Sequence, residues 1–184
     1  MKKPTLDEVK AMDITGLYSL AKDNDDNRRL LRGEAGVEHY KLLAWFSQQF
    51  NHSVLMEVGT LGGLGTIALS YNPTNIVHSF DIKSYKWGNE TPKNAKKELV
   101  YEGFVDDIVS SVPFIFYDTS HNGEDERWFF KQLVKNKWKG ILVLDDIYLN
   151  QEMKDFWENI PKKYEKEDWT DLGHATGTGI VYFK

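Results

Sequence analysis

Aspartates follow three short apolar runs in this chain of 184 residues. Asp81 follows the first run, Asp118 the second, and the pair Asp145 and Asp146 the third. Apolar runs of this length are typical of buried parallel strands, and an open parallel sheet binds ligands beyond the carboxyl ends of its strands. We therefore expect these carboxylates to converge on one edge of a sheet, although each could instead cap a helix or begin a turn.

The later acids predict a metal site. Asp118, Asp145 and Asp146 would supply hard oxygen ligands, which suit Mg²⁺. Without a cation, three neighbouring carboxylates repel one another and one stays protonated; a bound cation removes that repulsion and can acidify a substrate hydroxyl. His121 follows closely after Asp118 and is the candidate general base, since imidazole can take a proton near neutral pH. The alternative for His121 is a structural role.

A glycine-rich stretch, VLMEVGTLGGLGTIALS at 54–70, organises the elements around this edge. It reads as a strand, a glycine turn and a helix, the first half of a βαβ nucleotide site in which the backbone can approach the ligand closely. Glu57 lies in the strand, where a buried carboxylate is costly unless it is paired. Asp81, at the tip of the next strand, is placed to hold ribose hydroxyls.

Alternating strand and helix patterns predict a single α/β domain over 1–184, with a helical segment at 1–50 and a core at 51–184. We expect a Rossmann-like three-layer sandwich with a mostly parallel sheet and a C-terminal antiparallel hairpin at 169–183. The polar segment 83–97 is expected to be a loop. Strands are expected at 54–58, 76–80, 98–101, 112–117 and 140–144, and helices within 5–22, at 38–50, 66–69, 104–110 and 128–134, and after an N-cap at Asn150.

The composition excludes several classes of protein. The chain has no cysteine, so disulfides, thiolate nucleophiles and cysteine-ligated zinc are absent. A net charge of −5 without a basic patch argues against nucleic-acid binding, and no apolar run approaches the roughly 18 to 20 residues of a membrane helix. The basic N-terminus has no apolar region of a signal peptide. We therefore expect a cytoplasmic protein.

With these residues in view, the chain resembles the class I S-adenosylmethionine (SAM)-dependent methyltransferases over about 36–183. EVGTLGGLGT (57–66) is similar to the family's E-x-G-x-x-x-G loop, and FDI (80–82) to its ribose-binding acid. YDTSHNGE (117–124) resembles the D-G-D-H-x-x-E segment of small methyltransferases that act on sugars and related hydroxyls. LVLDDIY (142–148) resembles the paired acid that completes the Mg²⁺ site of metal-dependent O-methyltransferases.

The resemblance implies transfer of a methyl group from SAM to a hydroxyl of a sugar, a glycan or another small molecule, with Mg²⁺ as a second cofactor. Asp118, Asp145 and Asp146 would bind the metal, and Asp118 and His121 would be catalytic. Catechol-type relatives carry a lysine at the spacing of His121, which leaves the identity of the base open. The cofactor-binding residues would be Glu57, which supports the loop, and Gly59, Thr60, Gly63, Gly65, Thr66 and Asp81.

Other readings remain open. Residues 63–68 match the G-x-G-x-x-A pattern of NAD-dependent oxidoreductases, but that pattern should begin where the strand ends, near Val58. A non-catalytic module with a nucleotide fold and a methyltransferase without metal are the further alternatives. His174 could line the pocket or could simply belong to a glycine-rich turn, and Trp87 could line the pocket or pack against neighbours.

Overall fold

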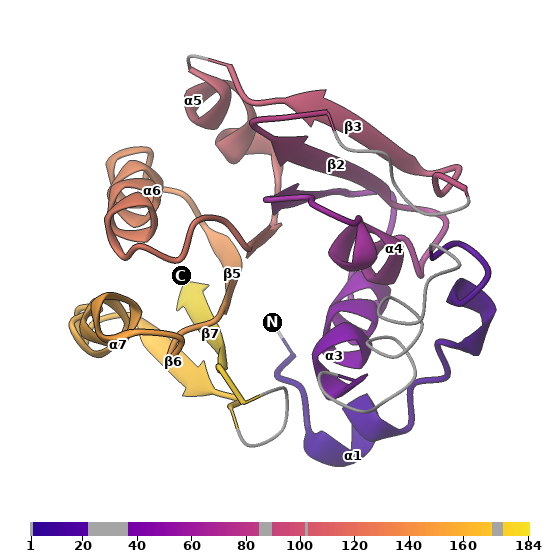
Figure 1. Cartoon of the computed structure of the whole chain (residues 1–184), viewed down its shortest axis with the longest axis horizontal. Helices are drawn as coiled ribbons and strands as arrows, with labels where there is room; N and C mark the ends of the chain where they lie inside the picture. The colour runs from indigo at the N-terminus through magenta and orange to yellow at the C-terminus, as the bar shows by residue number, and fades with distance from the viewer. Residues whose placement is uncertain (1, 22–36, 85–89, 102, 171–174) are drawn as a thin grey trace.

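A seven-stranded sheet forms the centre of the protein, in the order β3-β2-β1-β4-β5-β7-β6 (Figure 1). The structure, a computed structural model, describes residues 2–21, 37–84, 90–101, 103–170 and 175–184. The strands are β1 (Val54–Val58), β2 (Ile76–Asp81), β3 (Ala95–Leu99), β4 (Phe114–Tyr117), β5 (Gly140–Asp145), β6 (Glu165–Asp168) and β7 (Thr178–Phe183).

The first five strands are parallel, and β7 runs antiparallel to both β5 and β6. The predicted mostly parallel sheet with an antiparallel C-terminal hairpin is therefore confirmed. The order of the strands reverses at β1, which pairs with β2 on one side and with β4 on the other. In such sheets the ligand crevice opens at the carboxyl ends of the strands beside this reversal.

Helices cover both faces of the sheet and complete the predicted three layers (Figure 1). One apolar core joins α1, α3 and α4 to the sheet, and a second joins α5, α6 and α7 to the opposite face. No described helix is long and apolar enough to cross a bilayer. The helices are α1 (Leu6–Lys10), α3 (Val37–Gln48), α4 (Leu64–Leu69), α5 (Phe104–Ile108), α6 (Glu124–Lys135) and α7 (Gln151–Glu158), with short 3₁₀ turns at Thr15–Leu17 and Val109–Ser111.

The largest differences from the expected boundaries are in three elements. Strand β3 begins at Ala95, inside the expected loop 83–97, and ends before the predicted strand 98–101 does. The C-terminal hairpin begins earlier than predicted, with β6 at Glu165. Both are edge strands with charged side chains, so neither shows the apolar pattern that identifies the central strands. Helix α6 begins at Glu124, four residues before the predicted start at Trp128. Its first turn is polar, so the apolar pattern that predicted the helix starts only at Trp128.

Candidate functional site

The turn after β1 requires glycine at its first position. Gly59 adopts φ 94°, and its N–H donates a hydrogen bond of 2.8 Å to the carbonyl of Phe80 in β2. A Cβ on Gly59 would lie 1.5 Å from the carbonyl oxygen of Asp118. Only glycine therefore lets the chain leave β1 so close to the end of β4.

Glu57 lies behind this turn and joins β1, β2 and α4. Its carboxylate is 1% exposed and accepts hydrogen bonds from the hydroxyls of Thr66 and, at 2.5 Å, Ser79. A Cβ on Gly65 would lie 2.2 Å from Glu57 Oε1, so the helix packs directly on the carboxylate. Burial raises the pKa of Glu57 to about 8. These residues support the loop from behind and do not line the pocket described below.

Asp81 closes the same loop from the tip of β2. Its Oδ2 accepts the N–H groups of Thr60 at 2.8 Å and Leu61 at 3.1 Å, and its Oδ1 accepts the N–H of Lys83 at 3.1 Å. A carboxylate offers about four acceptor positions, so Asp81 can still receive a hydroxyl from a ligand.

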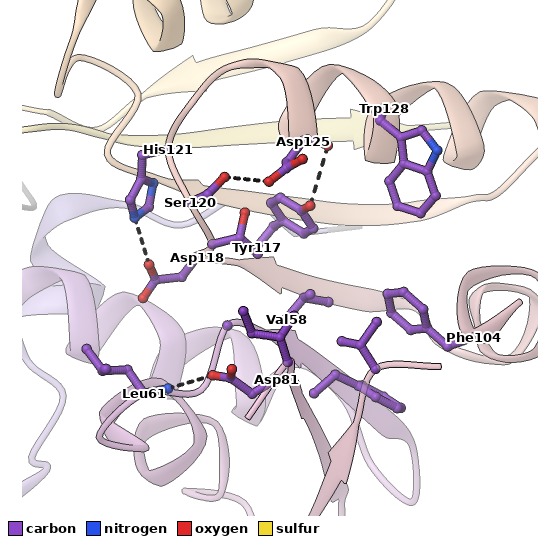
Figure 2. Close-up of a pocket in the computed structure, with 15 residues that line it drawn as sticks. Val58, Leu61, Asp81, Phe104, Tyr117, Asp118, Ser120, His121, Asp125 and Trp128 are labelled. Atoms are coloured by element: carbon purple, nitrogen blue, oxygen red, sulfur yellow. Dashed lines mark hydrogen bonds and ion pairs between the residues drawn. The ribbon is translucent and has the colours of Figure 1, made fainter. Parts of the chain in front are cut away.

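A pocket of about 570 Å³ opens at the carboxyl ends of β1, β2 and β4 (Figure 2). Asp81 lies on one side of the pocket, and Asp118 and His121 lie on the other. Between them the wall is mostly apolar, and several of its side chains remain exposed to solvent. The apolar lining consists of Val58, Leu61, Phe80, Ile82, Val100, Phe104, Tyr117 and Trp128.

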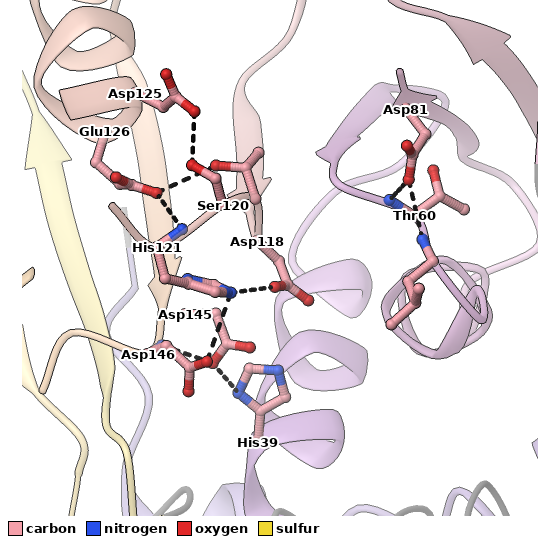
Figure 3. A network of polar contacts seen from close by, with 12 residues as sticks. His39, Thr60, Asp81, Asp118, Ser120, His121, Asp125, Glu126, Asp145 and Asp146 are labelled. Atoms are coloured by element: carbon pink, nitrogen blue, oxygen red, sulfur yellow. Dashed lines mark hydrogen bonds and ion pairs between the residues drawn. The ribbon is translucent and has the colours of Figure 1, made fainter. Parts of the chain in front are cut away.

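Asp118 and His121 line the polar end of this pocket, and the predicted residues Asp145 and Asp146 lie beside them (Figure 3). His121 Nε2 lies 3.2 Å from Asp118 Oδ1 and 3.5 Å from Asp146 Oδ2. Asp145, the last residue of β5, lies next to them, 3.8 Å from Nδ1 of His39. Within the described ranges, no group of three or more Asp, Glu, His or Cys side chains is arranged to hold a metal ion. The metal site remains a prediction.

Burial and neighbouring charges shift the pKa values of Asp118 and His121. Burial and the charge of Asp145 raise the pKa of Asp118 to about 7, against the opposing effect of His121. Burial alone would lower the pKa of His121, but its hydrogen bond to Asp118 and the charges of the acids outweigh burial and raise it to about 9. In this arrangement His121 carries its proton at neutral pH. A second positive charge among the carboxylates would favour the neutral imidazole, the form that can act as a base.

Several residues at the pocket hold the left-handed backbone conformation that favours glycine. They are Leu61 with φ 39°, His121 with φ 51° and Asp146 with φ 54°. In the part of the chain that the structure describes, the other two non-glycine residues with positive φ are His52 and Lys137, both in exposed turns. Backbone strain of this kind persists where the surrounding structure enforces it, and it is concentrated at functional sites.

Comparison with known proteins shows which solved structures share the fold of this chain. No protein-family model matches the sequence, and no curated protein is significantly similar to it. Among solved structures, the O-methyltransferase TomG from Streptomyces achromogenes, in complex with SAM, superposes with a TM-score of 0.60 at 14% identity and covers 94% of this chain and 91% of its own. The chain has the fold of a methyltransferase.

Two further methyltransferase structures show the same likeness. Podospora anserina methyltransferase PaMTH1, bound to S-adenosylhomocysteine (SAH), gives a TM-score of 0.56 at 10% identity, with 80% of this chain and 78% of that chain covered. The Bacillus cereus O-methyltransferase in complex with SAH gives 0.51 at 16% identity, with 100% and 92% covered. In this chain the strand order reverses at β1, and Asp81 and Asp118 lie at the ends of the two strands that flank it.

The sequence did not reveal two further side chains beside the cluster. Glu126 accepts the N–H of His121 at 3.2 Å and of Gly123 at 2.8 Å, and the hydroxyl of Thr119 at 3.1 Å. The YDTSHNGE segment ends at Glu124, which is exposed; the usable signal for Glu126 was its place in the first turn of a helix.

His39 was expected to be structural and lies buried beside Asp145. Its Nδ1 is 2.9 Å from the hydroxyl of Thr178 in β7. Nothing local in the sequence joins two residues that are 139 positions apart. His174 and Trp87, the other candidate pocket residues, lie outside the described residues.

Proposed function

We propose that this protein is a SAM-dependent O-methyltransferase that transfers a methyl group to a hydroxyl of a sugar, a glycan or a related small molecule, with the help of a divalent cation. One observation carries the proposal. Gly59, Asp81 at the tip of β2, and the pair Asp118 and His121 all face one pocket at the switch point of a methyltransferase fold.

The lining of the pocket suits the chemistry of the proposed cofactor. Asp81 would accept the ribose hydroxyls, and the apolar wall that includes Ile82 and Phe104 suits a flat heteroaromatic base. Gly59 and Thr60 would face the amino-acid end of the cofactor. Gly63, with φ 79°, begins α4, and the buried residues behind the loop keep that turn in place. The reactive methyl would then lie towards Asp118 and His121.

SAM supplies an activated methyl group on a sulfonium. The residues of this chain would hold the acceptor oxygen in line with that methyl, and such positioning accounts for much of the rate in reactions of this kind. As the C–O bond forms and the C–S bond breaks, the hydroxyl proton would pass to His121 or to the adjacent carboxylates. The products are the methyl ether and SAH.

Asp118, Asp145 and Asp146 would hold the cation, which supplies positive charge that orients and acidifies the acceptor hydroxyl. Carboxylate oxygens suit a hard cation, and those of Asp118 and Asp146 both lie close to Nε2 of His121. A metal-free enzyme is the alternative, in which protonated His121 itself neutralises the acids. Activity that survives a strong chelator would remove the metal from the proposal.

The NAD-dependent alternative is disfavoured by the position of the turn. Strand β1 ends at Val58 and the chain turns at Gly59, whereas the G-x-G-x-x-A match begins at Gly63, where the helix is already starting. Gly65 and Ala68 are buried inside α4. Neither is placed to approach a pyrophosphate.

Isothermal titration with SAH and with NAD, followed by transfer of labelled methyl from SAM to a panel of hydroxyl acceptors, tests the proposal. We expect SAH to bind and NAD not to. His121→Ala and Asp145→Asn should abolish turnover while affinity for SAH is nearly unchanged. Binding of NAD without binding of SAH would refute the proposal. Binding of SAH without transfer to any acceptor would favour the non-catalytic module.

A further inference from the structure

The turn that carries His121 packs against the first turn of α7. A Cβ on Gly123 would lie 2.6 Å from the carbonyl oxygen of Glu152. Arg127 joins the two segments, because its guanidinium donates to the carbonyl of Gly123 at 3.0 Å and to that of Glu152 at 3.2 Å. The position of His121 therefore depends on α7 as well as on its own helix, α6.

Asn150 makes two hydrogen bonds at this junction. Its Oδ1 accepts the N–H of Met153 at 2.8 Å, which is the predicted N-cap of α7. Its Nδ2 donates to the carbonyl oxygen of His121 at 2.7 Å. The first bond stabilises the helix, whereas the second crosses to another segment and reaches the backbone of the candidate base.

The connection from β5 to α7 thus holds His121 in two ways. Asp146, near its start, lies 3.5 Å from the imidazole, and Asn150, at its end, binds the carbonyl of the same residue. His121 has a left-handed backbone with φ 51°, which an L-residue keeps only when its surroundings enforce it. The φ and ψ of His121 fix the direction in which its ring leaves the backbone.

We infer that Asn150 is a positioning residue, which holds the His121 turn so that the imidazole lies between Asp118 and Asp146. The catalytic consequence rests on the proposed function, but the placement of the ring does not. Without the bond from Asn150, the turn keeps its hydrogen bonds to Glu126 and the helix keeps its place in the core. Loss of this hydrogen bond should therefore change the direction of the His121 ring without unfolding the protein.

The variant Asn150→Ser should keep the N-cap hydrogen bond to Met153 and lose the one to His121. Serine is as good an N-cap as asparagine, but one short hydroxyl cannot accept from Met153 and also reach His121. Asn122→Ser is the matched control, because Asn122 lies in the same turn and its Oδ1 likewise caps backbone N–H groups, those of Glu124 and Asp125. The amide of Asn122 donates to Asp125 and not to His121.

Activity is measured as transfer of labelled methyl from SAM to a vicinal-diol panel that includes catechol and a methyl glucoside. A displacement of about 1 Å at a reacting group can cost about 100-fold in rate. We expect kcat of Asn150→Ser to fall by roughly 10- to 100-fold. Its Kd for SAH should stay within about twofold, and kcat of Asn122→Ser within about twofold of the wild type, since neither change touches the reacting groups.

Ring chemical shifts give a readout that does not need turnover. The chain has five histidines, and comparison with His121→Asn assigns the ring signal of His121. In Asn150→Ser this signal should move, while in Asn122→Ser it should stay in place. An unmoved His121 signal in Asn150→Ser, or equal kcat values in the two serine variants, would overturn the inference. If the wild type transfers no methyl group, the proposed function fails and the ring signal alone decides the role of Asn150.

Discussion

The buried carboxyl group of Glu57 should make the stability of this protein fall as pH rises. The folded pKa is raised to about 8, above the ordinary glutamate value of 4.5 that describes the unfolded chain. Between these values the folded state binds the proton and the unfolded state releases it. By linkage, the free energy of unfolding then decreases with pH by up to about 1.4 kcal/mol per unit. Below pH 4.5 the effect is absent, and above pH 8 it is complete.

The total effect follows from the same shift. A pKa raised from 4.5 to about 8 corresponds to at most about 5 kcal/mol, of which about 3 kcal/mol has developed by pH 7. Domains of this kind unfold with about 5–15 kcal/mol in all, so the loss is measurable. Glu57→Gln should remove the dependence, since the amide resembles the protonated acid and its oxygen can accept from the hydroxyls of Thr66 and Ser79.

Urea unfolding, followed by tryptophan fluorescence from pH 5 to 8.5, measures the difference between wild type and Glu57→Gln. We expect the variant to gain stability relative to the wild type as pH rises, and the difference to level off above pH 8. Glu165→Gln is the control, because hydrogen bonds with Lys184 and Lys3 lower the pKa of the half-buried Glu165 to about 2. Its contribution is lost only in acid, so its difference curve should be flat from pH 5 to 8.5.

The opposite slope for Glu57→Gln would refute this reasoning. If the wild type gained stability relative to the variant as pH rises, the carboxylate would be ionised in the fold. The loop would then supply enough hydrogen-bond donors to outweigh burial. A flat difference curve would show that the folded and unfolded pKa values are equal.

Further outcomes follow from the pocket. Gly59→Ala should lower the unfolding free energy by roughly 3 kcal/mol or more and abolish SAH binding in calorimetry, because a side chain cannot fit beside the Asp118 carbonyl; unchanged binding would contradict the geometry. Asp81→Asn should weaken the binding of SAH by roughly 10- to 100-fold, since an amide is a weaker acceptor than a carboxylate. Its melting temperature should be nearly unchanged, because the amide oxygen can still accept hydrogen bonds from the N–H groups of the loop. His121→Asn should lower kcat by roughly 100- to 10,000-fold with SAH affinity unchanged, and wild-type turnover in this variant would exclude His121 as the base.

The central strands of the sheet could be predicted from the sequence because they are buried and therefore consist of apolar residues. Strands β1, β4 and β5 are almost entirely buried and apolar. Strand β3, AKKEL, lies at the sheet edge with its lysines exposed, and β6, EKED, lies at the other edge. Their pairing comes from backbone hydrogen bonds with a neighbouring strand, which the side chains of an edge strand do not reveal.

The site could be predicted only as far as the sheet itself positions it. Asp81, Asp118 and Asp145 lie at the same edge of the sheet because each ends or follows a parallel strand. The order of residues along the chain is enough to predict this. Asn150 and His121 meet because two helical N-termini pack against each other, across 29 positions of sequence. No periodic pattern in the sequence predicts such a contact. The sequence therefore predicted that Asn150 caps α7 but not that it also binds the carbonyl of His121.

The left-handed residues around the pocket also bear on protein engineering. Leu61, His121 and Asp146 would each relax if replaced by glycine, so a selection for heat resistance alone should favour glycine at all three positions. His52 and Lys137 hold the same conformation in exposed turns and could take glycine without touching the pocket. A thermostability screen of this protein would thus remove the proposed chemistry at His121 and Asp146, whereas glycine at His52 and Lys137 would leave it intact.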